Sequence, residues 1–278
     1  MKPAREVVED ALREEPDSDE RWAHVVALHK RGDDESFVAA AELLDSPDAD
    51  RRALAADILA QLGAAPGVPV EQRPLAGSAF ELLLQRIGEE EHTEVLQSIA
   101  SAFGHLADPR GIPALYALRN HPDDDVRHAV VLGLCGQDDD LAIDTLVELT
   151  RDSDADVRDW ATFGLGTQVE RDDARIRDAL IARLDDPDDD TRGEALRGLG
   201  VRGDERAIPR LLAELDSRAE LEDPSVVQEA LLALAARTGD VRLCGHVATA
   251  SREWAETRAS EPMPDELRSA VEACERAL

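Results

Sequence analysis

The stretch that decides the fold runs from Asp154 to Gly166 and reads Asp-Ala-Asp-Val-Arg-Asp-Trp-Ala-Thr-Phe-Gly-Leu-Gly. Its skeleton is Val-Arg-x-x-Ala-x-x-x-Leu-Gly, entered through a turn rich in aspartate. Other parts of the chain repeat this skeleton, so the molecule is organised as an array of related units. The copies are 44, 31, 31, 34 and 35 residues apart and begin at Arg51, Val95, Val126, Val157, Thr191 and Val226.

Small or apolar residues recur at positions 0, 4 and 8 of the copies, apart from Arg51 at the start of the first; in the fourth they are Val157, Ala161 and Leu165. Residues four apart lie on one face of an α-helix, so each copy predicts a helix with one apolar stripe. A second helical pattern precedes each copy; Ile143 and Leu146 belong to the one before Asp154. Each unit is therefore predicted to be a helix, an aspartate-rich turn and a second helix.

Two helices in every 30 to 35 residues predict an all-α fold, an α-α superhelix of about seven two-helix repeats. We expect residues 1–278 to form one such solenoid. Its predicted parts are an N-terminal cap at 1–34, repeats at 35–237 with an insert near 64–74, and a C-terminal cap at 238–278.

The pattern Asp-x-Asp-Val-Arg…Ala…Leu-Gly, preceded by Arg-x-Ile-Pro, resembles the HEAT-like repeats of the phycobilin-lyase (PBS lyase) type. The resemblance covers roughly residues 35–237. It implies a solenoid related to armadillo arrays, with turn aspartates and the following arginines forming a ladder between neighbouring repeats. The matching pairs here are Asp50 with Arg52, Asp125 with Arg127, Asp156 with Arg158, and Asp190 with Arg192.

The charge is extreme: the formal net charge is −30 at pH 7, and the only lysines are Lys2 and Lys30. Such a surface repels phosphate backbones and anionic membranes, so we expect neither nucleic acid nor membrane as a partner. It favours a basic partner, although adaptation to high salt would leave the same composition.

The three cysteines are odd in number and widely spaced. This pattern argues against a disulfide framework and predicts reduced thiols in a cytoplasmic protein. The N-terminal residues contain no apolar signal core, and no apolar run approaches the ~20 residues that span a bilayer.

The aspartate runs are predicted to be helix caps, not metal sites. Asp152, Asp154 and Asp156 imitate the opening of a calcium loop, but Val157 stands where that loop needs glycine and Phe163 where it needs glutamate. The di-iron hydroxylases built from similar repeats carry His-Glu pairs, and no copy here has an intact pair. We therefore expect no catalytic residue, metal or cofactor.

Positions 2, 3 and 6 of each second helix lie off the apolar stripe, so we expect them to face the concave surface. In the fourth copy they include Trp160 and Phe163, one turn apart in a chain with 3% aromatic residues. These rings either anchor a ligand or fill space beside neighbouring glycines. The predicted binding residues are Asp159, Trp160, Phe163, His128, Leu132, Glu194 and Arg197.

These observations predict a non-catalytic, monomeric scaffold that binds a protein or peptide on its concave face. The alternative is a modifying enzyme or enzyme subunit resembling the bilin lyases, which the repeat resemblance alone suggests. A DNA-binding array similar to the HEAT-like alkylpurine glycosylases requires a basic groove, and the charge of −30 opposes it.

Overall fold

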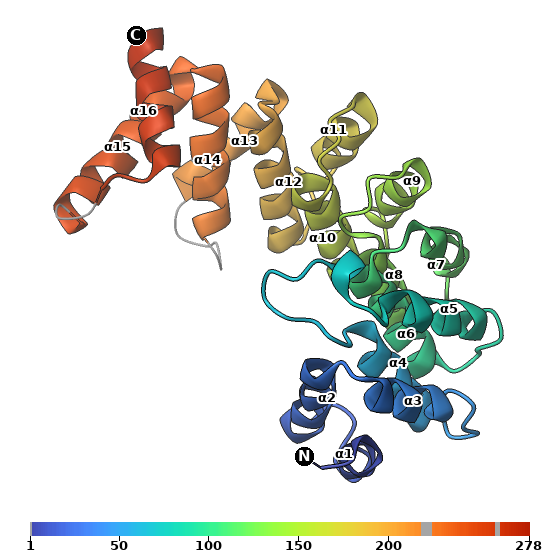
Figure 1. Ribbon diagram of the computed structural model, residues 1–278. Helices are drawn as coiled ribbons and strands as arrows, with labels where there is room; N and C mark the ends of the chain where they lie inside the picture. Colours follow the sequence, from blue (N-terminus) through green and yellow to red (C-terminus); the bar gives the residue numbers. More distant parts are fainter. Residues whose placement is uncertain (1, 218–223, 259–261) are drawn as a thin grey trace. The chain divides into compact units, whose positions relative to one another are not determined.

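The computed structural model describes residues 2–217, 224–258 and 262–278, and every regular element in these ranges is helical (Figure 1). The all-α prediction is confirmed. The contacts divide the chain into two compact units, residues 1–145 and 146–278, which are described separately. That residues 1–278 form one continuous array stays a prediction. In the described ranges no helix is both long and apolar enough to cross a membrane.

Unit 1 is a series of helix pairs in which the second helices stack on one another: α2 contacts α4, α4 contacts α6, and α6 contacts α8. The first helices pack against their partners, as α3 does on α4 and α5 on α6. The helices are α1 (Ala4–Ala11), α2 (Asp19–Arg31), α3 (Asp34–Leu43), α4 (Ala49–Ala60), α5 (Ala76–Ile87), α6 (Thr93–Leu106), α7 (Ile112–Leu118), α8 (Asp124–Leu134) and α9 (Asp140–Leu149), within which the unit boundary falls.

Unit 2 repeats this arrangement, with α10 against α12, α12 against α14, and α14 against α16. We call the exposed side of α10, α12 and α14 the second-helix surface of unit 2. The helices are α10 (Ala155–Phe163), α11 (Ala174–Ile181), α12 (Asp189–Arg202), α13 (Ile208–Ser217), α14 (Pro224–Thr238), α15 (Val241–Thr257) and α16 (Asp265–Ala277). The last two, α15 and α16, lie within the segment 238–278 that was predicted as the C-terminal cap.

The predicted apolar stripe forms the core of each repeat. Val157, Ala161 and Leu165 are fully buried in unit 2, and their counterparts Val126 and Val130 are fully buried in unit 1. Leucine, valine and alanine supply most of this core, so the helices stack closely. The helix-stacked architecture follows from a stripe that only the neighbouring repeat can cover.

The aspartates before the second helices are helix caps, as predicted. Asp154 accepts a hydrogen bond from the amide of Val157 at 3.0 Å, and Asp188 accepts one from the amide of Thr191 at 2.8 Å. Each bond satisfies an amide that lacks a partner within the helix, and the carboxylate lies at the positive end of the helix dipole.

The glycine that ends the repeat skeleton permits close contact between neighbouring second helices in unit 2. A methyl group added at Gly166, which ends the skeleton, would lie 3.2 Å from Cα of Gly198 in α12, and one added at Gly198 would lie 2.6 Å from Cα of Gly166. Beyond α10 the chain continues as a π-helical turn, Gly164–Gln168, whose carbonyl oxygens face Arg202 of α12. The sequence did not predict this widened turn.

The insert near residues 64–74 contains a short 3₁₀ turn, Val70–Gln72, and its prolines and glycine disfavour a continuous helix. The insert is hydrogen-bonded to α6 of unit 1, because Arg73 donates a hydrogen bond to the carbonyl oxygen of His105 at 2.6 Å.

The expectation of reduced thiols was wrong for two of the three cysteines. Cys244 of α15 and Cys274 of α16 form a disulfide, and Cys135 is free. The two helices pack side by side, which brings together residues that lie 30 apart in the sequence. Spacing alone carries no information about such a tertiary contact.

Candidate functional site

The predicted aromatic pair lies at the surface of α10. The side chain of Trp160 is 40% exposed, and its ring meets the half-buried ring of Phe163 edge-on, with centroids 5.6 Å apart and planes at 77°. Such T-shaped contacts stabilise aromatic pairs and hold the rings in a defined orientation. Trp160 therefore presents an oriented, partly exposed ring at the surface of α10.

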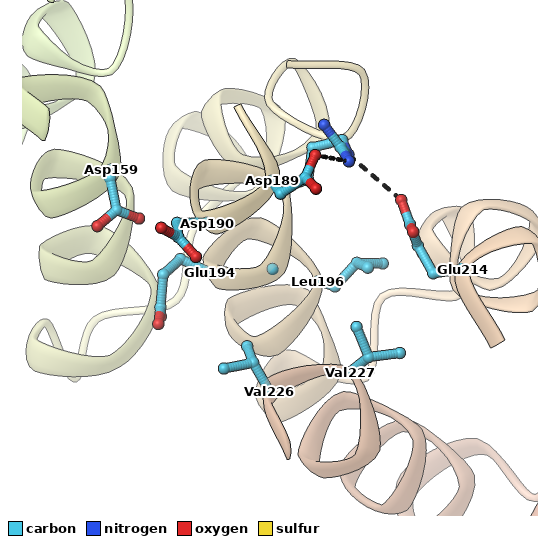
Figure 2. A pocket seen from close by; sticks show the side chains of 10 residues that line it. Asp159, Asp189, Asp190, Glu194, Leu196, Glu214, Val226 and Val227 are labelled. Carbon is cyan, nitrogen blue, oxygen red and sulfur yellow. Dashed lines mark hydrogen bonds and ion pairs between the residues drawn. The ribbon is translucent and has the colours of Figure 1, made fainter. Parts of the chain in front are cut away.

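An acidic cavity of about 210 Å³ lies at Asp159, the residue before Trp160, and is lined by residues of α10, α12, α13 and α14 (Figure 2). Figure 2 shows Asp159 on α10 and Asp190 and Glu194 on α12 with their carboxyl groups on facing sides of the gap. Val226 and Val227, at the start of α14, form an apolar part of the wall. We call these five residues and the space they line the acidic cavity.

Burial makes ionisation of these carboxyl groups costly. Burial, together with the negative charges of Glu194 and Asp190, raises the pKa of Asp159 to about 7. Burial also raises the pKa of Glu194. Within the described residues, Oδ1 of Asp159 and Oε2 of Glu194 are buried and accept no hydrogen bond. A cation in the cavity would relieve this unfavourable arrangement.

Arginines neutralise only part of the cavity wall. Arg192 forms ion pairs with Asp189 and with Glu214, the latter at 3.2 Å (Figure 2). On the other side, Arg197 lies 3.3 Å from Glu194 and 2.7 Å from Glu229 of α14. The described structure shows no such partner for Asp159.

Of the seven predicted binding residues, five lie on α10 and α12 of unit 2: Asp159, Trp160, Phe163, Glu194 and Arg197. The other two, His128 and Leu132, are half-buried on α8 of unit 1. The binding role of all seven stays a prediction.

The arginines at the predicted ladder positions bridge neighbouring repeats. Arg52 of α4 donates to Glu90, before α6, at 2.8 Å, and Arg158 of α10 donates to Asp186, before α12, at 3.1 Å. The acceptors differ from the aspartates that the repeat pattern suggested. Both arginines are largely buried, so these bonds stabilise the stacking of repeats.

Among the ladder aspartates, Asp50 pairs with Arg21 of the preceding repeat at 2.6 Å. Arg127 donates to the carbonyl oxygen of His121 at 2.9 Å. The remaining ladder aspartates, Asp125, Asp156 and Asp190, are exposed, and their role in a ladder stays a prediction.

A second hollow that sequence reasoning missed lies between α12, α14, α15 and α16. This apolar groove has a volume of about 760 Å³ and is lined by residues that include Val201, Leu232, Ala250, Trp254, Pro264 and Leu267. The guanidinium of Arg258 lies 5.1 Å from the centre of the Trp254 ring. The sequence held one indication of this groove, because Trp254, one of three tryptophans in the chain, lies in the predicted C-terminal cap.

In the ranges described above, no group of three or more histidine, cysteine, aspartate or glutamate side chains is arranged to hold a metal ion.

Comparison with protein families identifies the repeats. A family model described as HEAT repeats matches residues 80–166 and 176–273, more than half of the chain. The chain belongs to the HEAT repeat family. The second match extends through α15 and into α16, helices that lie in the predicted C-terminal cap; the division into repeats and caps stays a prediction.

Protein YibA of Escherichia coli K12 is 33% identical to this chain over 98 residues, which is 35% of this chain and 35% of YibA. The match thus spans about a third of that relative's length. The crystal structure of YibA superimposes with a TM-score of 0.69 at 21% identity, over 98% of this chain and 92% of that one. An engineered protein gives a TM-score of 0.57 at 19% identity, over 100% and 79%. These similarities establish the fold.

Proposed function

We propose that this protein is a non-catalytic scaffold that binds a peptide or protein on the second-helix surface of unit 2, with Trp160 and Phe163 as the anchor. The observation that carries the proposal is the exposed, edge-stacked ring of Trp160 beside the acidic cavity. Tryptophan is enriched among the residues that dominate binding energy, because it contributes a large and rigid contact area.

The charge of the cavity favours a ligand with a basic side chain. Asp159, Asp190 and Glu194 line it; Arg197 pairs with Glu194, while Arg192, which also lines the cavity, pairs with Asp189 and Glu214. Arginine and lysine side chains form their strongest hydrogen bonds with carboxylates in such partly desolvated places. The net charge of −30 also attracts basic segments from a distance.

Selection from a random peptide library displayed on phage tests the proposal without a known partner. We expect the purified protein to select peptides, and Trp160→Ala and Phe163→Ala each to weaken their binding by about tenfold or more. Trp22→Ala is the matched control, because Trp22 is similarly exposed, at 44%, but lies on α2 of unit 1. Circular dichroism must show that each variant keeps its helices.

Two results would contradict the proposal. One is a folded protein that selects no peptide. The other is peptide binding that Trp160→Ala and Phe163→Ala leave as strong as Trp22→Ala does.

A further inference from the structure

We infer that the second-helix surface of unit 2 recognises two features of its ligand, a basic side chain in the acidic cavity and, about 10 Å away, a large apolar side chain in the groove beside Trp254. This inference rests on the proposed function and specifies the chemistry of the partner. Neither the sequence pattern nor the family resemblance pointed to the groove.

The two hollows lie along one face of α12. Glu194 lines the acidic cavity, and Val201 lines the groove seven residues later. Seven residues make two helical turns, so both side chains lie on the same face and about 10 Å apart along the axis. A single ligand segment can therefore reach both.

Arg197 connects the two hollows. It lies between Glu194 and Val201 on α12 and lines the groove, while it pairs with Glu194 at 3.3 Å and with Glu229 at 2.7 Å. This ion-paired bridge separates an acidic end from an apolar end on one surface. A bound ligand must therefore place its basic side chain at the Glu194 end of this surface and its apolar side chain at the Val201 end.

The groove suits an apolar side chain. Leu232 of α14 and Trp254 of α15 line it, and Val201 is 44% exposed at its edge. Filling it with an aromatic or branched side chain would remove apolar surface from water, at roughly 25 cal/mol per Å².

The negative charge around the acidic cavity favours a cation as the ligand group that enters it. Asp159 and Glu194 each have one buried carboxyl oxygen without a hydrogen bond, and Asp190 adds a further negative charge. An anionic group, or a group without a hydrogen-bond donor, would leave these carboxyl oxygens unsatisfied, and a neutral donor would leave the negative charge uncompensated. A guanidinium or ammonium group supplies both charge and donors.

The distance constrains the ligand sequence. In a polyproline II segment, side chains three residues apart lie on one face at about 9 Å. In an α-helix, side chains seven residues apart lie on one face at about 10 Å. The ligand should therefore carry its arginine or lysine three or seven residues from a large apolar residue.

The same phage-displayed library provides the test. Peptides selected by the wild-type protein should share this pair at a spacing of three or seven residues. Glu194→Gln and Val201→Ser should each weaken binding of one synthetic selected peptide by about tenfold or more. Glu205→Gln and Val241→Ser are matched controls at exposed positions off the surface, and they should leave binding unchanged.

Failure of this inference can be told apart from failure of the proposed function. Peptides that depend on Trp160 but lack the spaced pair, or that bind Glu194→Gln and Val201→Ser as tightly as the wild type, would overturn the inference alone. A folded protein that selects no peptide would overturn both.

Discussion

Arg202 of α12 donates a hydrogen bond of 2.6 Å to the carbonyl oxygen of Gly166, 36 residues earlier in the chain. The same guanidinium donates to the carbonyl oxygens of Leu165 at 2.8 Å and Val169 at 3.1 Å. These carbonyls belong to the end of the π-helical turn after α10, where helix carbonyls lack partners in their own helix. One buried side chain thus completes the end of the preceding repeat.

Replacing Arg202 by methionine keeps much of its volume but removes these bonds. Several buried carbonyl oxygens lose their donor, so we expect a loss of unfolding free energy of at least about 2 kcal/mol. Urea denaturation measures it. Arg276→Met, at a side chain that is 69% exposed, is the control and should change stability by less than about 0.5 kcal/mol. If Arg202→Met changes stability as little as Arg276→Met does, the hydrogen bonds of Arg202 contribute no stability.

Gly198→Ala tests the close contact between α12 and the end of α10. The added methyl group would lie 2.6 Å from Cα of Gly166, so one helix must move. We expect destabilisation of about 1–3 kcal/mol, although alanine is the better helix former. Gly245→Ala is the control, because no atom lies within 4 Å of its new methyl group and the change should stabilise α15 slightly. Thermal unfolding distinguishes the two directions.

Glu90→Gln tests the buried ion pair of unit 1. Glu90 accepts hydrogen bonds from Arg52 at 2.8 Å and from Arg86 at 2.8 Å, and the Glu90 side chain is only 1% exposed. Glutamine leaves the buried Arg52 without a compensating charge, which typically costs about 3–5 kcal/mol. The neighbouring, exposed Glu91→Gln makes the same change of charge and should have little effect on the urea midpoint. A stable Glu90→Gln protein would refute this account.

Asp159→Asn should change how stability depends on pH. In the folded protein the pKa of Asp159 is about 7, raised from its ordinary value of 3.8. The folded state therefore binds this proton more tightly than the unfolded state, so Asp159 stabilises the fold fully below about pH 4, and this contribution is lost as pH rises to about 7. Asparagine cannot ionise, so the variant does not lose this contribution to stability as the pH rises.

The variant should accordingly exceed the wild type in stability at pH 8 and match it near pH 4. Solvent screens a half-buried carboxyl group, so we expect a difference of about 1–2 kcal/mol at pH 8. Asp156→Asn, an exposed change on the same helix, controls for net charge. Parallel stability curves for Asp159→Asn and wild type across this range would contradict the assignment.

The disulfide between Cys244 and Cys274 should stabilise the C-terminal helices. It closes a loop with a sequence separation of 30, for which chain entropy predicts about 3–4 kcal/mol. The double change Cys244→Ala and Cys274→Ala should lose this amount in urea denaturation under oxidising conditions. With dithiothreitol present, variant and wild type should converge; a difference that persists would point to packing instead.

Much of the repeat architecture could be predicted, because it follows from local periodicity. The stripe of Val157, Ala161 and Leu165 is buried because a helix places residues four apart on one face. The capping by Asp154 is equally local. Each needs only the residues of one helix and its entry turn, which the sequence presents side by side.

The parts that could not be predicted depend on contacts between elements. Cys244 pairs with Cys274 because α15 packs on α16, and Asp190 lines the acidic cavity because α12 packs on α10. Trp254 lies in a region where the repeat skeleton had faded, so nothing marked it as part of a groove. Trp160 and Phe163 could be singled out from the sequence because they lie off the apolar stripe in a chain with 3% aromatic residues.

The cross-link between α15 and α16 has a mechanical consequence. If the protein is pulled by its two ends, the disulfide prevents the stretch from Cys244 to Cys274 from extending. The force therefore cannot extend about 100 Å of the chain. Helices outside this loop can unfold one repeat at a time, whereas across the loop the force is carried by the covalent S–S bond. A force–extension trace should therefore fall short of full contour length by this amount and recover it after reduction.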